Sequence, residues 1–111
     1  MEKDNYTYIN HILEFTKTIS EFMNGKSKED FLKDRMLQDA VIRKIEIIEE
    51  ATKYISIEFK NEHDEIPWQQ MERITRIILP DYFSPEINLV YETAIKWIPE
   101  LKVQIEKLLN Q

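Results

Sequence analysis

The chain has 111 residues, of which 42% are hydrophobic, so it is long enough to bury a real core in one domain and too short for two. It has no cysteine, which excludes disulfides and thiolate metal ligands and favours a reducing, cytoplasmic setting. The net charge of -6 disfavours indiscriminate binding to nucleic acid phosphates, and no segment approaches the roughly 20 apolar residues that a membrane span needs.

The composition, with one glycine and four prolines among many Glu, Lys, Ile and Leu residues, predicts an all-α protein. A first helix is expected from Asn5 to Asn24, where apolar residues recur at three- and four-residue steps until Asn24-Gly25 ends the pattern. Ser27 and Asp30 resemble a capping box, which predicts a short connecting helix. The strongest periodicity, from about Asp34 to Ile55, predicts the central helix of a bundle.

The next segment, Ser56 to Ile66, loses this period and accumulates charge. It is predicted to be a connection with one helical turn around Glu58 to Asn61. Pro67 is expected to open another helix, because a missing N–H is harmless in the first turn. That helix is expected to end at Ile78 or Leu79, because Pro80 biases the preceding residue away from the helical region.

The last predicted helix begins at Ser84-Pro85-Glu86, read as an N-cap, a first-turn proline and a first-turn acid. Its apolar stripe continues from Ile87 to Leu108, and Pro99 is expected to kink it or divide it in two. We therefore expect one helical domain over residues 1–111. Its predicted architecture is an antiparallel four-helix bundle with an additional short helix.

The ionisable residues form no recognisable catalytic or metal-binding motif. His11 and His63 have no partner at metal-ligand spacing, so neither a metal nor a cofactor is expected. Phosphate-binding and nucleophile-elbow motifs need glycines that the chain lacks. We interpret two carboxylate clusters as solvated faces, namely Glu46, Glu49 and Glu50, and Glu62, Asp64 and Glu65. The arginines can each be surface ion-pair partners: Arg35, Arg43, Arg73 and Arg76.

Three segments occur in a characteristic order and spacing: DRMLQDAVIRKIEIIEEATKYIS, EFKNEHDEIPW and DYFSPEINLVYETAIKWIPELKVQIEKL. Together with YINHILEF near the start, they closely resemble the HepT-like proteins of the HEPN superfamily over essentially the whole chain. This resemblance implies a HEPN-like helical bundle that forms homodimers with a cleft between the subunits. It also implies a ribonuclease toxin of a toxin–antitoxin pair, whose partner is a minimal nucleotidyltransferase antitoxin.

The family's signature is an arginine, four residues, a histidine, one residue and a tyrosine, placed where the Trp-containing helix ends. In such a set, histidine moves a proton and arginine stabilises charge on the phosphorane. Aligning the retained Asp-Tyr-Phe places Thr75 on the arginine, Pro80 on the histidine and Tyr82 on the tyrosine. Arg76 is adjacent to the arginine position, but one residue rotates a helical side chain by about 100°. The resemblance therefore implies a degenerate ribonuclease motif.

The resemblance also implies roles for two further residues. In some family members the antitoxin transfers AMP to the signature tyrosine, which makes Tyr82 a candidate AMP acceptor, although a tyrosine after a helix end can equally cap the core. Glu49 stands where many relatives have glycine in the sequence IIGEA. A carboxylate there is expected to change how closely elements approach across that face.

Three hypotheses remain open from the sequence. In the first, the chain is a non-catalytic or weakly active HepT-like subunit that dimerises and binds a nucleotidyltransferase. In the second, it is an active endoribonuclease that uses a relocated set, for instance Arg73 or Arg76 with His63. In the third, which the acidic balance supports, it is a non-enzymatic helical interaction module with no role in RNA chemistry.

Overall fold

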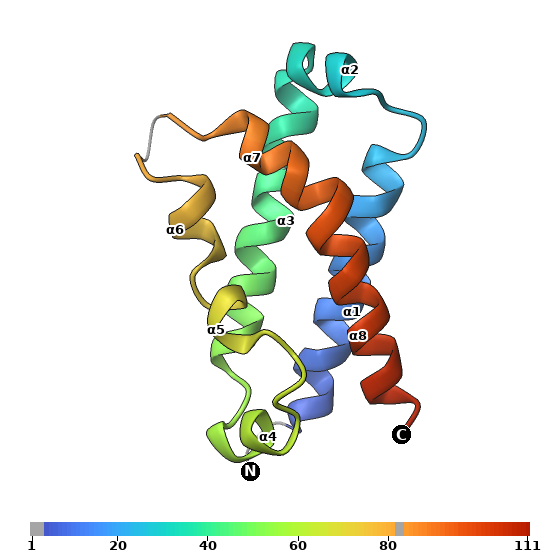
Figure 1. The fold of residues 1–111 in the computed structure, drawn as a ribbon, viewed down its shortest axis with the longest axis vertical. Coiled ribbons are helices and arrows are strands. Elements are labelled where there is room, and N and C mark those ends of the chain that lie inside the picture. Colours follow the sequence, from blue (N-terminus) through green and yellow to red (C-terminus); the bar gives the residue numbers. More distant parts are fainter. Residues whose placement is uncertain (1–3, 82–83) are drawn as a thin grey trace.

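The computed structural model describes residues 4–81 and 84–111, which fold into a set of packed helices (Figure 1). In chain order these are α1 (Asn5–Met23), α2 (Lys28–Lys33), α3 (Arg35–Lys53), α4 (Ile57–Glu62), α5 (Trp68–Met71), α6 (Ile74–Ile78), α7 (Ile87–Glu92), the π-helix η1 (Thr93–Trp97) and α8 (Ile98–Leu109). Among the described residues, none of these helices is long and apolar enough to cross a membrane. The prediction of an all-α, HEPN-like bundle is confirmed.

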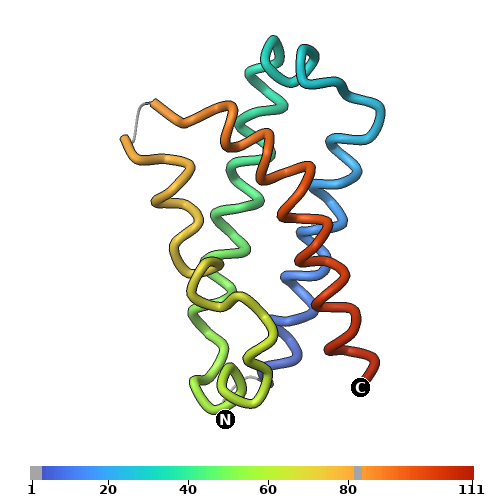
Figure 2. Tube along the Cα trace, in the orientation of Figure 1, coloured from blue at the N-terminus to red at the C-terminus, as the bar shows by residue number. Residues whose placement is uncertain are grey.

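The long helices run alternately up and down the molecule (Figure 2). α1 packs against both α3 and α8, while α5 and α6 together form the short rod that returns beside α3. α7, η1 and α8 then continue as one rod back to the end where α4 lies. The described helices therefore form an antiparallel bundle in which one of the four rods is built from two short helices.

The ends of the first helices are set by local side-chain hydrogen bonds. Asp4 accepts from the backbone N–H of Tyr6 at the start of α1, and Asp34 accepts from that of Leu37 at the start of α3. Ser27 and Asp30 form the predicted capping box of α2, with each side chain accepting from the other's backbone N–H. The turn predicted around Glu58 is the helix α4.

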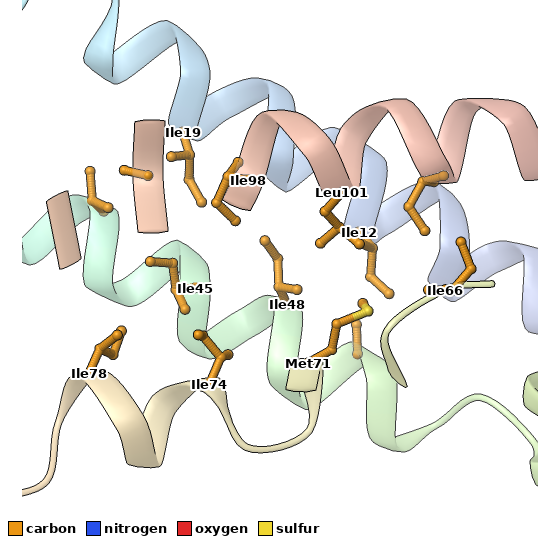
Figure 3. Close-up of a cluster of buried hydrophobic side chains, with 14 of the residues drawn as sticks. Ile12, Ile19, Ile45, Ile48, Ile66, Met71, Ile74, Ile78, Ile98 and Leu101 are labelled. Carbon is orange, nitrogen blue, oxygen red and sulfur yellow. The ribbon is translucent and has the colours of Figure 1, made fainter. Parts of the chain in front are cut away.

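The core is a cluster of aliphatic side chains contributed by every rod of the bundle (Figure 3). Burying one such side chain stabilises the fold by about 1.5–3 kcal/mol. The labelled residues, all buried, are Ile12 and Ile19 of α1, Ile45 and Ile48 of α3, Ile66, Met71, Ile74 and Ile78 around α5 and α6, and Ile98 and Leu101 of α8. The face of α6 that carries Ile74 and Ile78 is thereby held against α3.

The prediction of one continuous helix after Pro67 is wrong, because the chain leaves the helical conformation at Arg73, whose φ is -125° and ψ is 4°. The helix α5 also begins one residue later than expected, with Pro67 at its N-cap. The break turns Ile77, which the periodicity places in the apolar stripe, to 46% exposure. Two polar interactions with other helices accompany the break, an ion pair of Glu72 and a hydrogen bond to Thr75.

The prediction that Ser84 is an N-cap is also wrong. The backbone N–H of Ser84 donates to the carbonyl of Asp81 in an isolated antiparallel bridge, and α7 begins only at Ile87. The N-cap is Glu86, which uses no side-chain hydrogen bond, and its backbone N–H donates to the carbonyl of Ile78 at 2.9 Å. That long-range bond ties the start of α7 to the end of α6.

The expected effect of Pro99 is confirmed, since the last helix is divided rather than regular. The turn before the proline widens into η1, where the backbone N–H of Ile98 donates to the carbonyl of Thr93. Proline lacks an N–H and its ring crowds the preceding turn, so an inserted residue relieves the clash without ending the helix. α8 then continues with Pro99 in its first turn.

Candidate functional site

The positions singled out by the family resemblance lie on α3, on α6 and in the turn that follows α6. Thr75 is the second residue of α6, and its backbone N–H donates to Oε1 of Glu49 on α3 at 2.9 Å. The N-cap residue Arg73 makes no side-chain hydrogen bond to the helix. The carboxylate of Glu49 therefore takes the place of a local N-cap and holds the start of α6 on the central helix.

The interpretation of Glu49 as part of a solvated face is therefore wrong. Its side chain is only 16% exposed, and its second oxygen, Oε2, lies 3.6 Å from Nζ of Lys53. Glu50 beside it is exposed, as expected for a solvated face. Glu49 is the least exposed member of its cluster because its carboxylate reaches the start of α6.

A hollow of about 530 Å³ opens beside Thr75. We call it the acidic hollow, and it is lined by Arg43, Glu46, Ile47, Glu49, Glu50 and Thr75. Its three carboxylates outnumber its single guanidinium, and Nη1 of Arg43 already lies 3.8 Å from Oε1 of Glu46. Such a lining disfavours an RNA phosphate.

The hydroxyl of Thr75 cannot take over the role of an arginine. Its Oγ1 is buried and has no hydrogen-bond partner within the described parts of the chain. An unmet buried hydroxyl costs on the order of 1–3 kcal/mol, so the threonine is accommodated in this position at some expense of stability. A neutral, enclosed hydroxyl places no positive charge beside a phosphate.

Pro80 lies exposed in the turn after α6, between a helix end and the bridge of Asp81 with Ser84. The last helical bond of this segment is donated by the N–H of Leu79 to the carbonyl of Thr75 at 2.8 Å. Proline has no group that titrates, so the position of the family's histidine carries no acid or base. Tyr82, the candidate AMP acceptor, falls outside the described residues.

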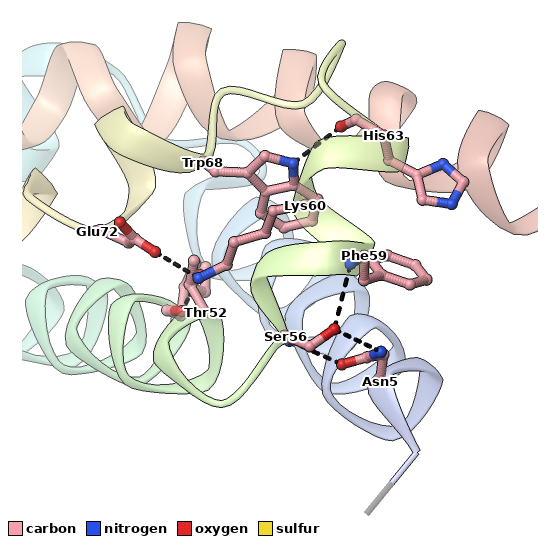
Figure 4. A network of polar contacts seen from close by, with 9 residues as sticks. Asn5, Thr52, Ser56, Phe59, Lys60, His63, Trp68 and Glu72 are labelled. Carbon is pink, nitrogen blue, oxygen red and sulfur yellow. Dashed lines mark hydrogen bonds and ion pairs between the residues drawn. The ribbon is translucent and has the colours of Figure 1, made fainter.

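The relocated set suggested by the sequence is not brought together in the described chain. His63 ends α4, with its ring 4.4 Å from that of Phe59 and its Nδ1 3.7 Å from Oε1 of Glu65. The hollow around it is lined by residues of the α4 end and of α8, and contains no arginine: Glu62, His63, Glu65, Gln104, Lys107 and Gln111. Its imidazole points away from Glu72, the residue next to Arg73 (Figure 4). Arg73 and Arg76 are exposed on the α6 side of the molecule.

The other ionisable candidates have structural or surface positions. Arg35 pairs with Asp39 at 3.3 Å, as the interpretation of the arginines as ion-pair partners expects. His11 is exposed on α1 with its ring 6.1 Å from that of Tyr8. Within residues 4–81 and 84–111, no three His, Asp or Glu side chains gather in a way that could hold a metal ion.

A polar network that the sequence did not reveal ties α4 to its neighbours (Figure 4). Nζ of Lys60 lies 2.5 Å from Oε1 of Glu72, and Nε1 of Trp68 donates to the carbonyl of His63 at 2.9 Å. Asn5 both donates to the hydroxyl of Ser56 and accepts from its backbone N–H. Lys60 and Glu72 are 12 residues apart and Asn5 and Ser56 are 51 residues apart, so no periodic pattern relates them.

Comparison with known proteins places this geometry in a family. Residues 12–108 match the family described as "Ribonuclease HepT-like". The chain is 40% identical over 108 residues to the "Probable ribonuclease HepT" of Thermococcus cleftensis, covering 97% of this chain and 98% of that protein. It is 36% identical over 104 residues to a "Putative RNase" of Caldanaerobacter subterraneus, covering 94% of this chain and 93% of that protein.

A third relative is longer than this chain. The "Gamma-glutamylcyclotransferase and putative RNase" of Methanocaldococcus jannaschii is 40% identical over all 111 residues, which span 50% of its length. No solved structure matches the chain. The matched family and the two relatives that this chain covers almost completely agree with the helical bundle and with the resemblance described above. The chain therefore belongs to the HepT-like ribonuclease family.

Proposed function

We propose that this protein is a HepT-like toxin–antitoxin subunit whose ribonuclease motif is degenerate. In this proposal it acts as one helical domain over residues 1–111 that forms a homodimer and binds a minimal nucleotidyltransferase antitoxin. The observation that carries the proposal is the state of the motif positions. A neutral, buried Thr75 hydroxyl stands where the arginine is expected and an exposed Pro80 where the histidine is expected.

The chemistry of RNA cleavage explains why these two replacements matter. Transfer of a proton from the ribose hydroxyl or to the leaving oxygen needs a titratable group, and charge that develops on the phosphorane needs a cation or other donor. Thr75 and Pro80 supply neither, and the acidic hollow beside Thr75 adds negative charge. These features support loss of the family's catalytic step rather than a change in RNA preference.

The direct test measures RNA cleavage by the purified native protein. We expect no cleavage above that of buffer alone, with an RNA that a HepT-like ribonuclease with an intact motif degrades as the positive control. Cleavage by the native protein would contradict the proposal. If it occurred, its loss in a His63→Ala, Arg76→Ala double variant would identify the relocated endoribonuclease set, whereas its persistence would exclude that set.

The partner part of the proposal places Tyr82 as the acceptor of AMP. In this step the phenolic oxygen attacks the α-phosphate of ATP, the bond between the α- and β-phosphates breaks, pyrophosphate leaves and the phenol loses its proton. The nucleotidyltransferase supplies the catalysis. The added phosphate brings negative charge and bulk to the turn after α6, which would block a dimer cleft or a partner surface there.

Coexpression with a nucleotidyltransferase encoded beside this chain tests the partner claim. We expect the two proteins to copurify and intact-mass measurement to show added AMP on the native chain but not on Tyr82→Phe. Tyr91, a second tyrosine on α7, is the matched control, because Tyr91→Phe is expected to be modified like the native chain. Absence of copurification would favour a helical interaction module of another kind, and an unmodified Tyr82 beside an active partner would remove its role as acceptor.

A further inference from the structure

Two residues that the family resemblance singles out are in direct contact. Glu49, where the resemblance implies a glycine, accepts a hydrogen bond from the backbone N–H of Thr75, where the resemblance implies the motif arginine. The residues are 26 positions apart and come from different helices, α3 and α6. Because the bond is to the backbone of Thr75, the carboxylate lies beside the point from which an arginine side chain at position 75 would extend.

Glu49 carries its charge at a partly buried place. Its side chain is 16% exposed, and its ion-pair partner, Nζ of Lys53, lies 3.6 Å from Oε2 on a lysine whose own side chain is 54% exposed. Glu46 and Glu50 line the same acidic hollow, and Arg43 is engaged with Glu46. Electrostatic interactions at a partly buried site are screened less than at an open surface, so this carboxylate acts strongly on any charge placed next to it.

We propose that Glu49 is a third residue, besides Thr75 and Pro80, that prevents RNA cleavage at the ribonuclease motif. Its carboxylate captures a cation introduced at position 75 as an ion pair and repels an approaching RNA phosphate. Replacing Thr75 by arginine and Pro80 by histidine is therefore not sufficient to restore cleavage. The charge at position 49 must be removed as well. This inference rests on the proposed function, because it concerns why the same motif does not cleave RNA.

The variant Glu49→Gln separates charge from structure. The amide oxygen of glutamine can still accept the N–H of Thr75, so the support of α6 is retained while the negative charge is lost. Glu50→Gln is the matched control, because Glu50 lines the same hollow and is exposed. Glu49→Asp keeps the charge on a shorter side chain. Each is made in the full chain that carries Thr75→Arg and Pro80→His, and circular dichroism verifies the helix content of every variant.

RNA cleavage is the first readout. The Thr75→Arg, Pro80→His chain is expected to stay near background, and adding Glu49→Gln is expected to raise the cleavage rate by at least about tenfold, a conservative share of what one well-placed charged donor contributes to catalysis. Adding Glu50→Gln or Glu49→Asp is expected to change the rate less than about twofold. The inference is overturned if the chain without any change at Glu49 already cleaves as fast, or if Glu49→Gln adds nothing.

RNA binding is the second readout, and a merely structural role of Glu49 would not change it in this way. With a single-stranded oligonucleotide, freeing the arginine adds one phosphate contact, so the slope of log affinity against log salt becomes steeper by about 0.7. An unchanged slope in the Glu49→Gln background would contradict capture of the cation. These outcomes are distinct from failure of the proposed function, which would appear as cleavage by the native protein itself.

Discussion

The ammonium group of Lys60 on α4 lies 2.5 Å from Oε1 of Glu72, in the turn between α5 and α6, with only 14% of the lysine side chain exposed (Figure 4). A lysine that is this enclosed depends on its partner, because an unpaired charge held away from water is costly. The pair also holds the residue just before Arg73, where the helix between Pro67 and Ile78 is broken. The ion pair therefore connects α4 to the segment that leads into α6, the helix that carries the motif position Thr75.

Removing the carboxylate of this pair is expected to destabilise the protein. Glu72→Ala leaves Lys60 unpaired and is expected to lower the free energy of unfolding by about 1–2 kcal/mol, less than a fully buried pair because the Glu72 side chain is 36% exposed. Urea denaturation measures the change. Glu29→Ala is the control, because the Glu29–Lys33 pair is exposed and its loss is expected to cost less than about 0.5 kcal/mol. Equal effects of the two changes would contradict a special role of Lys60.

Loss of the carboxylate at Glu49 is expected to free the start of α6. In Glu49→Ala the N–H of Thr75 loses its acceptor, so its amide hydrogen exchanges faster and the free energy of unfolding falls by about 0.5–2 kcal/mol, as for loss of an N-cap. Hydrogen exchange followed by mass spectrometry or NMR checks the first effect. In Glu50→Ala, the exchange of Thr75 is expected to match the native protein, and an unchanged rate in Glu49→Ala would refute the capping role.

The capping box of α2 predicts a specific pH dependence. The backbone N–H and the hydroxyl of Ser27 both bond with Asp30 and hold the pKa of that carboxyl below its ordinary value of 3.8. Because the folded pKa is depressed, the stabilising effect is present above the unfolded pKa and is lost as the pH falls below 3.8 through the folded pKa. Asp30→Asn is expected to lose that part of the acid dependence.

Thermal unfolding between neutral and strongly acidic pH tests this prediction. The difference in Tm between the native protein and Asp30→Asn is expected to be largest near neutral pH and to shrink as Asp30 protonates. Glu29→Gln is the matched control, since Glu29 lies in the same first turn of α2 but does not take part in the capping box. A difference that stays constant down to acidic pH would mean that the charge of Asp30 does not stabilise the helix.

Ile48 tests the core that holds α6 in place. It is fully buried on α3 among the residues of Figure 3, so Ile48→Ala is expected to lower the free energy of unfolding by about 2–5 kcal/mol through lost burial and a residual cavity. Ile57, which is 71% exposed on α4, is the matched control, and Ile57→Ala is expected to change stability by less than about 0.5 kcal/mol. Chemical denaturation followed by circular dichroism compares the two, and a small effect at Ile48 would contradict the described packing.

Local patterns were sufficient for most of the fold. The apolar period alone located α1, α3 and the rod that ends in α8, and the short-range signals at Ser27 and Pro99 predicted a capped helix and an interrupted one. The same reasoning failed between Pro67 and Ile78, where the periodicity continues through a broken helix. It failed because the two short helices still bury Trp68, Met71, Ile74 and Ile78, so most of the apolar stripe, all but Ile77, remains although the helix is broken.

The candidate site was also predictable from the sequence only in part. The family resemblance identified Thr75, Pro80 and Glu49 as positions of interest one at a time, but their spacing in the chain carried no sign that Glu49 and Thr75 touch. The sequence also left open the relocated set with His63 as an alternative. It loses support because α4 places that ring beside Phe59 and the end of α8, on a different part of the surface from α6.

By itself, the sequence determined which chemical groups exist at the motif and which segments are helical. A proline cannot move a proton and a threonine carries no charge in any fold, and helix periodicity is a property of neighbouring residues. Only the tertiary structure decided that α6 starts on a carboxylate from α3 and that His63 lies beside Phe59 and the end of α8, in a hollow without an arginine. Such contacts form only after packing has brought distant helices together, so no local pattern encodes them.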